Sequence, residues 1–185
     1  MIFEEKTMKS EKIYEGKILT LRVDTVELPD KKYSKREIVE HPGGVAIVPI
    51  TNENEIVFVK QFRKATETVL LEIPAGKLEI NEHPLDCAIR ELKEETGLEA
   101  KKIEHIIDYF SSPGFTNEKI HIFIATEVIF GEATPEEDEY MDVVKVDINE
   151  AMDMINNGTI IDGKTIIGIF MAYESMKKNS RSEIE

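Results

Sequence analysis

Two glutamates one helical turn apart, Glu91 and Glu95, are the residues of this chain best suited to carry chemistry. At about 100° per residue they fall on the same flank of a helix, so their carboxylates stack. Stacked like charges destabilise a helix unless a positive charge compensates. Carboxylate oxygens without Cys or His ligands nearby suit Mg²⁺ or Mn²⁺, and Mg²⁺ is usually held by one or two carboxylates plus substrate phosphates. The pair therefore predicts a magnesium site facing a diphosphate, and the alternative is an acidic, solvated helix face.

The neighbouring residues predict the helix that would position this pair. Pro84 suits a first helical turn, where its missing N–H costs nothing. Gly97 suits the left-handed position at which a helix ends. Apolar residues recur between them at i, i+3, i+4 and i+7, namely Leu85, Ala88, Ile89 and Leu92. This spacing predicts one apolar face, with Glu94 opposite it and the two glutamates on its flank.

The wider stretch from Gly76 to Leu98 resembles the Nudix hydrolase box, Gly-x5-Glu-x7-Arg-Glu-U-x-Glu-Glu-x-Gly-U, where U is a bulky aliphatic residue. Its fixed positions are Gly76, Glu82, Arg90, Glu91, Glu94, Glu95 and Gly97, and all of them match. The resemblance implies a Mg-dependent enzyme that cleaves a diphosphate linked to another moiety. It implies metal ligands at Glu91, Glu95 and the backbone carbonyl of Ala75. Arg90 and Glu94 belong to the expected catalytic set, with Arg90 expected to pair with Glu82.

A second motif narrows the expected substrate. Pro113 follows Leu98 by 15 residues, within the sequence SPGFTNE at 112–118. Ser-Pro-Gly alone is a common turn. In register with the box, it resembles the ADP-ribose pyrophosphatase branch of the bacterial type. This resemblance implies ADP-ribose as the substrate, with Gly114 and Glu118 among its binding residues.

Two arginines are expected to bind the diphosphate and the terminal ribose. Arg36 and Arg63 occur where relatives in this branch carry arginines with that role. A guanidinium fork binds phosphate oxygens bidentately and would also offset the acidic metal site. The alternative for each is a surface arginine at the end of a strand. The N-terminal arm with Phe3 resembles a segment that crosses to a second subunit and contacts adenine, which implies a homodimer.

The catalytic base is expected downstream of the box, in the acidic loop 134–140. In this branch the base lies on a mobile loop, and the resemblance aligns Glu137 with it. Glu139 aligns with a further metal ligand. Glu136 stays a candidate base because the alignment could slip by one residue, and the alternative is a solvated acidic loop.

These residues together predict Mg-dependent hydrolysis of ADP-ribose to AMP and ribose 5-phosphate. The loop glutamate would take a proton from the attacking water. Two rival hypotheses remain: a Nudix enzyme for a nucleotide sugar or an oxidised nucleotide, and a non-catalytic nucleotide sensor. Sensors typically lose glutamates of the box, and this chain keeps them all.

Composition limits the remaining choices. The chain has 185 residues and a net charge of −14, so one domain with a sizeable core is expected and duplex nucleic acid is an unsuitable partner. Apolar runs fall short of the roughly 18 residues of a membrane span. The N-terminus lacks the apolar stretch of a secretory signal, so a cytoplasmic location is expected. The single cysteine, Cys87, is interpreted as a packing residue, because no partner histidine is near it in sequence.

The order of the expected elements favours a mixed sheet between helices. Strands are expected at 18–28, 34–41, 45–50, 56–62, 103–109 and 120–128, with a hairpin turn at 51–55. Later helices are expected from a cap at Asp147 to Ile155, and from a cap at Asp162 to about Lys177. The prediction is an α/β (α+β) fold, the Nudix-type α/β/α sandwich. Its expected parts are an N-terminal β-rich dimerisation arm at 1–42, a Nudix hydrolase domain at 43–180 and a polar tail at 181–185.

Overall fold

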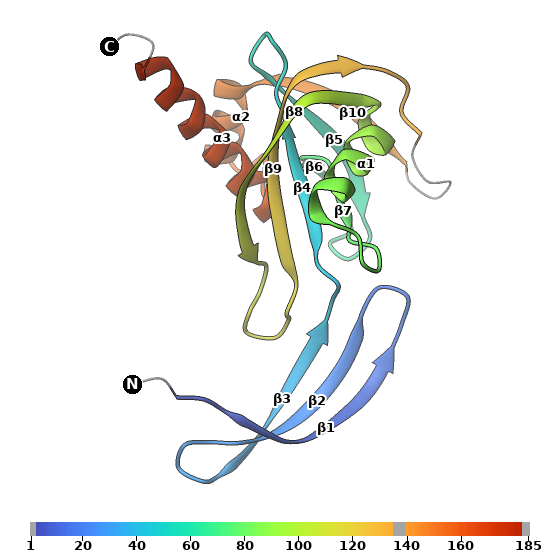
Figure 1. The fold of residues 1–185 in the computed structure, drawn as a ribbon, viewed down its shortest axis with the longest axis vertical. Helices are drawn as coiled ribbons and strands as arrows, with labels where there is room; N and C mark the ends of the chain where they lie inside the picture. Colours follow the sequence, from blue (N-terminus) through green and yellow to red (C-terminus); the bar gives the residue numbers. More distant parts are fainter. Residues whose placement is uncertain (1–2, 135–139, 183–185) are drawn as a thin grey trace. The chain divides into compact units, whose positions relative to one another are not determined.

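The structure is a computed structural model that describes residues 3–134 and 140–182, the last five of these by backbone only (Figure 1). Contacts divide the chain into two units. The first comprises residues 1–43 and 109–119, and the second comprises residues 44–108 and 120–185. The segment 109–119 thus joins the unit that contains the expected N-terminal arm.

The first unit is built on three antiparallel strands in the order β1-β2-β3. Their bounds are β1 (Lys6–Glu15), β2 (Thr20–Glu27) and β3 (Tyr33–Glu40). Strands β2 and β3 are close to the expected ones, whereas β1 was not predicted. Every residue of β1 is exposed, so the strand carries none of the alternation in burial that makes a strand visible in sequence. The segment 109–119 joins β3 through Val39, whose N–H donates to the Phe115 carbonyl at 2.8 Å.

The second unit holds two sheets. One has the order β7-β4-β9-β8, with β4 parallel to β9 and antiparallel to β7. Its strands are β7 (Ala75–Lys77), β4 (Gly44–Pro49), β9 (Lys119–Phe130) and β8 (Leu98–Phe110). The other sheet has the order β10-β5-β6, formed by β10 (Met141–Asp147), β5 (Glu55–Arg63) and β6 (Thr68–Glu72). The expected mixed sheet is therefore present, while β6, β7 and β10 were not predicted.

The turn between β4 and β5 forms as expected, but the two strands belong to different sheets. The Thr51 N–H donates to the Glu55 carbonyl at 2.9 Å, and Asn54 adopts a left-handed φ of 61°. Only the bridge between Ile50 and Ile56 joins the strands at this end. All of β4 and the run from Ile56 to Val59 in β5 are buried, so these apolar runs carry no sign of which sheet each strand joins.

Three helices complete the second unit: α1 (Pro84–Thr96), α2 (Ile148–Asn156) and α3 (Gly163–Ser182). Helices α1 and α3 both contact β4 and flank it in Figure 1, which agrees with the expected layered α+β fold. The expected caps are also present. Asp147 accepts from the Asn149 N–H at 2.8 Å, and Asp162 accepts from the Thr165 N–H at 3.0 Å. No helix in the described part of the chain is long and apolar enough to cross a membrane.

Helix α1 buries a different stripe from the one its apolar residues predicted. Ala88 and Leu92 lie in the core as expected, but Ile89 is 48% exposed. Cys87, Glu91 and Glu95 are buried instead. The helix is turned so that its core-facing stripe includes both carboxylates, which a count of apolar residues could not anticipate.

Gly97 ends helix α1 in a left-handed conformation, with φ of 70° and its N–H on the Lys93 carbonyl at 2.8 Å. A Cβ at this position would lie 2.7 Å from backbone atoms of the segment 131–133. Gly158 has a similar φ of 78° but open space around it. The two glycines therefore separate the effect of backbone conformation from that of crowding.

We expect Gly97→Ala to lower the free energy of unfolding by clearly more than Gly158→Ala does. The left-handed conformation alone costs an alanine about 1–2 kcal/mol at either position. Gly97→Ala adds overlap with fixed backbone. Urea unfolding of both variants measures the difference, and equal losses would show that the 131–133 segment yields freely.

Candidate active site

Strand β7 and helix α1 bring backbone and carboxylates together. The Ala75 N–H donates to Glu95 Oε2 at 3.0 Å. A Cβ on Gly76 would overlap the carboxylate of Glu91 and push it aside, so glycine is what lets the strand approach. Glu91 and Glu95 are only 9% and 3% exposed. The three expected metal-binding residues, Ala75, Glu91 and Glu95, therefore gather at one place.

Arg90 places a positive charge against Glu91, one of the two stacked carboxylates. Its Nη1 donates to Glu91 Oε1 at 2.7 Å and to Glu94 Oε2 at 2.9 Å. Its Nε and Nη2 donate to the two carboxylate oxygens of Glu82 at 2.9 and 3.1 Å. The expected Arg90–Glu82 ion pair is thus present, and the same guanidinium also orients Glu91.

The Glu82 carboxylate is held ionised by its surroundings. The hydrogen bonds from Arg90 lower the pKa of Glu82 from 4.5 to about 2, with a further contribution from the Glu79 N–H at 2.9 Å. The pKa of Arg90 is raised by the same contact. Burial, together with the charge of Glu82, raises the pKa of the Cys87 thiol. Cys87 is fully buried among apolar residues, in agreement with its interpretation as a packing residue.

The donor set of this cluster fits a hard divalent cation. Arg90 is one positive charge in contact with three carboxylates, Glu82, Glu91 and Glu94. Glu95, which is buried on the same helix as Glu91, adds a fourth carboxylate. The cluster is thus rich in negative charge and in oxygen donors, the ligands that Mg²⁺ and Mn²⁺ prefer. The only thiol within it is kept protonated, which disfavours thiolate coordination.

Arg63 lies beside the acidic cluster and is fixed by a buried partner. Its Nε and Nη2 donate to the two oxygens of Glu72 at 2.7 and 2.8 Å. These bonds raise the pKa of Arg63, and the negative charges of Glu95 and Asp162 raise it further. Arg63 is therefore held within electrostatic reach of Glu95 and is not a freely solvated surface arginine.

Glu72 is the residue of this region that the sequence did not single out. It is 1% exposed and accepts from both Arg63 and Lys164. Burial raises the pKa of Glu72, but the hydrogen bonds and charges of the two cations outweigh it, and the pKa lies below its ordinary value. A charged residue directly before Ile73, at the end of an apolar strand, was the available signal. Its partners are distant in sequence, so the pairing itself was not readable.

The other candidate binding residues belong to the first unit. Arg36 donates to Glu5 through Nε at 2.9 Å and to Ser34 Oγ at 2.9 Å. Glu118 accepts from Ser111 Oγ and lies 3.4 Å from His41 Nδ1. Gly114 has open space around it, and Phe3 is 69% exposed.

The acidic-loop candidates Glu136, Glu137 and Glu139 lie outside the described residues. The segment that leads to this loop is fixed to the end of helix α1. The Thr134 N–H donates to the Glu94 carbonyl at 3.0 Å, and the Gly131 N–H donates to the Gly97 carbonyl at 2.8 Å. The segment that precedes the acidic loop is thus bonded to the end of the helix that carries Glu91 and Glu95.

We expect Glu82→Gln to lower the free energy of unfolding by roughly 1–2 kcal/mol near neutral pH, because the lowered pKa of Glu82 reflects a favourable ion pair that solvent partly screens. Because this pKa is depressed on folding, the contribution is present above about pH 4.5 and is lost as the pH falls toward 2. Urea unfolding of the native protein and of Glu82→Gln measures the difference in free energy of unfolding, which should be smaller near pH 3 than near pH 7. Glu79→Gln in the same loop is the matched control, and a gap independent of pH would contradict the electrostatic origin.

Comparison with known proteins agrees with this geometry. Residues 40–166 match the NUDIX domain, and residues 5–44 match the nucleoside diphosphate sugar hydrolase N-terminal domain. The chain is 48% identical to the methanol dehydrogenase activator of Bacillus methanolicus, over 91% of this chain and 92% of that protein. It is 47% identical to the ADP-ribose pyrophosphatase of Bacillus subtilis (strain 168), over 90% of this chain and 91% of that protein.

The fold has a solved counterpart. A crystal structure of an ADP compounds hydrolase aligns with a TM-score of 0.85 at 20% identity, covering 96% of this chain and 97% of that one. The NUDIX match spans more than half of the chain and includes the complete acidic box. The chain therefore belongs to the Nudix hydrolases, enzymes that generally use divalent metal ions.

Proposed function

We propose that this Nudix hydrolase cleaves the diphosphate of ADP-ribose to give AMP and ribose 5-phosphate, with Mg²⁺ as its cofactor and Mn²⁺ as an alternative. The observation that carries the proposal is the 47% identity to an ADP-ribose pyrophosphatase over about nine tenths of both chains. The SPGFTNE motif at 112–118 supports the same substrate.

In this proposal the box holds the metal through Glu91, Glu95 and the carbonyl of Ala75. The bound metal would offset diphosphate charge and lower the pKa of a water molecule. Arg90 contributes by fixing Glu91 through the 2.7 Å hydrogen bond, and Glu94 keeps that guanidinium in place. The Ala75 N–H fixes Glu95 in the same way.

We assign Arg63 and Arg36 to the diphosphate and terminal ribose, and Gly114, Glu118 and Phe3 to the rest of the substrate. Arg63 is supported by its tie to Glu72, which restrains the guanidinium before substrate arrives. The base is proposed to be Glu137, with Glu136 as the alternative, and Glu139 is proposed as a further metal ligand. Their loop starts at Thr134, which is bonded to the box helix.

A homodimer in the cytoplasm, formed through the dimerisation arm at 1–42, is part of the same proposal. Large apolar side chains are exposed on this arm, among them Met8, Ile13, Tyr14 and Tyr33. Burying such side chains at an interface is favourable.

Two rival functions have a specific observation behind them. The N-terminal match to nucleoside diphosphate sugar hydrolases favours a nucleotide sugar as substrate. The 48% identity to a methanol dehydrogenase activator favours a regulatory role toward a dehydrogenase. A substrate panel tests the first, together with oxidised nucleotides. The second is tested by measuring the activity of a methanol dehydrogenase with the native chain and with its Glu95→Gln variant. Equal activation by the two proteins would favour a non-catalytic role.

Purified protein with Mg²⁺ is expected to convert ADP-ribose to AMP and ribose 5-phosphate, and EDTA to abolish the reaction. Glu95→Gln keeps an oxygen for the Ala75 N–H but loses the charge, so turnover should fall by at least about a hundredfold with folding preserved. Glu99→Gln, an exposed position beyond the helix, is the matched control. Chromatography of the products measures both. Near-normal turnover in Glu95→Gln would contradict the assignment of Glu95 as a metal ligand. If no AMP forms with any divalent metal, ADP-ribose is not the substrate.

Arg63→Lys should raise the KM for ADP-ribose by about tenfold or more, since a charge-assisted hydrogen bond contributes roughly 1.5–3 kcal/mol and lysine lacks the bidentate fork. Glu72→Gln provides the comparison, because it loosens the same arginine without removing it. Steady-state kinetics and thermal unfolding are measured together. If both variants lose stability while the KM stays unchanged, Arg63 serves the fold and not the substrate.

A further inference from the structure

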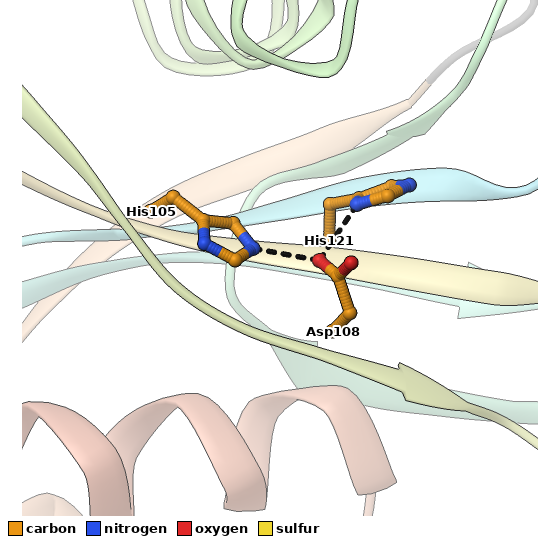
Figure 2. A group of neighbouring side chains, drawn as sticks. All are labelled: His105, Asp108 and His121. Carbon is orange, nitrogen blue, oxygen red and sulfur yellow. Dashed lines mark hydrogen bonds and ion pairs between the residues drawn. The ribbon is translucent and has the colours of Figure 1, made fainter.

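Two imidazoles and one carboxylate converge on strands β8 and β9, apart from the acidic box. His105 Nε2 lies 2.6 Å from Asp108 Oδ1, and His121 Nδ1 lies 2.7 Å from the same oxygen. Figure 2 shows the two rings on either side of this carboxylate. One potential ligand atom from each residue lies within 4.8 Å of the others.

The local strand geometry brings His105 and Asp108 to one side. Residues three apart on a regular strand point to opposite faces. Here the alternation in burial breaks, because the adjacent residues Ile106 and Ile107 are both half-buried while His105 and Asp108 are both exposed. The 2.6 Å contact between His105 and Asp108 shows that the two side chains meet on one side of the strand.

The neighbouring strand restrains the cluster. His121 and Phe123 lie two apart on β9 and so share a face. The Phe123 ring is buried in the core and meets the His105 ring edge-on, with centroids 5.4 Å apart. His121 is itself largely buried, with 16% of its side chain exposed. Two of the three groups thus have fixed positions, and the partly exposed face of His105 and Asp108 leaves a route for an ion.

The ligand chemistry differs from that of the box. Two imidazole nitrogens and one carboxylate oxygen are ligands typical of zinc, whereas Mg²⁺ prefers oxygen alone. Zinc bonds of about 2.0–2.2 Å place neighbouring ligands roughly 3.3 Å apart in a tetrahedral site. The present N···O separations are those of hydrogen bonds, so metal binding needs each to open by well under an ångström. Both separations end on the Asp108 carboxylate, so rotation of this exposed side chain opens them while the two rings stay in place.

We propose that His105, Asp108 and His121 form a second metal site that binds Zn²⁺ and joins strand β8 to strand β9. Nε2 of His105, Nδ1 of His121 and Oδ1 of Asp108 are the ligands, and water completes the coordination. Binding displaces the protons that hydrogen-bond the rings to Asp108, and these protons pass to the other ring nitrogens or to solvent. Zinc affinity therefore falls as the pH is lowered. The inference does not depend on ADP-ribose being the substrate.

The test is calorimetric titration of Zn²⁺ into metal-free full-length protein in excess Mg²⁺, which competes for the box. We expect a zinc site in the native chain and in Glu95→Gln. His105→Ala, His121→Ala and Asp108→Asn should each weaken it by at least about tenfold, since losing even an outer-shell partner has that effect. His83→Asn is the matched control, because it removes a histidine outside the cluster and keeps a side chain able to cap helix α1.

A second readout separates binding from folding. Zinc should raise the thermal midpoint of the native protein and not that of Asp108→Asn, which keeps the shape of the side chain. Unchanged zinc affinity in the three ligand variants would overturn the site. Loss of zinc binding in Glu95→Gln, with the ligand variants unaffected, would place the ion in the box and overturn it equally.

Discussion

The second unit depends on burying negative charge along the core-facing stripe of helix α1. Glu91 and Glu95 occupy positions that an ordinary amphipathic helix gives to apolar side chains. An unpaired buried carboxylate is strongly unfavourable, so the surroundings must supply donors and cations. Arg90, the Ala75 N–H and the nearby charge of Arg63 do so. The approach of β7, the position of β6 with Glu72, and the orientation of α1 all follow from that requirement.

The cations beside the acidic box are shared with other carboxylates. Arg90 is shared among three carboxylates, and Arg63 is engaged by Glu72. The same place concentrates oxygen donors of the kind a divalent cation prefers. If the cation binds there as proposed, folding and metal affinity depend on the same residues, and a stronger internal ion pair would weaken the cation site.

Local features were readable from the sequence, and long-range ones were not. Pro84, Gly97, Asp147 and Asp162 act within a few residues of their own position, so the helix ends followed from residue type. The stacked glutamates and the ion pair between Arg90 and Glu82 were predictable for the same reason. Strand β1 carries no buried residue, and the division of β4 and β5 between two sheets depends on partners far along the chain. Glu72 was missed because one of its partners, Lys164, lies far along the chain. The His105–Asp108 pair was missed because residues three apart on a regular strand are not expected to meet.

The contact between Gly76 and the Glu91 carboxylate has an evolutionary consequence. Any side chain at position 76 would displace a carboxylate that Arg90 holds in place, so the glycine and the glutamate constrain each other. If Glu91 were shortened, position 76 would become free to vary. A lineage that abandoned hydrolysis would then accumulate substitutions at both positions together, and a return to activity would need the glycine restored before the glutamate could be of use.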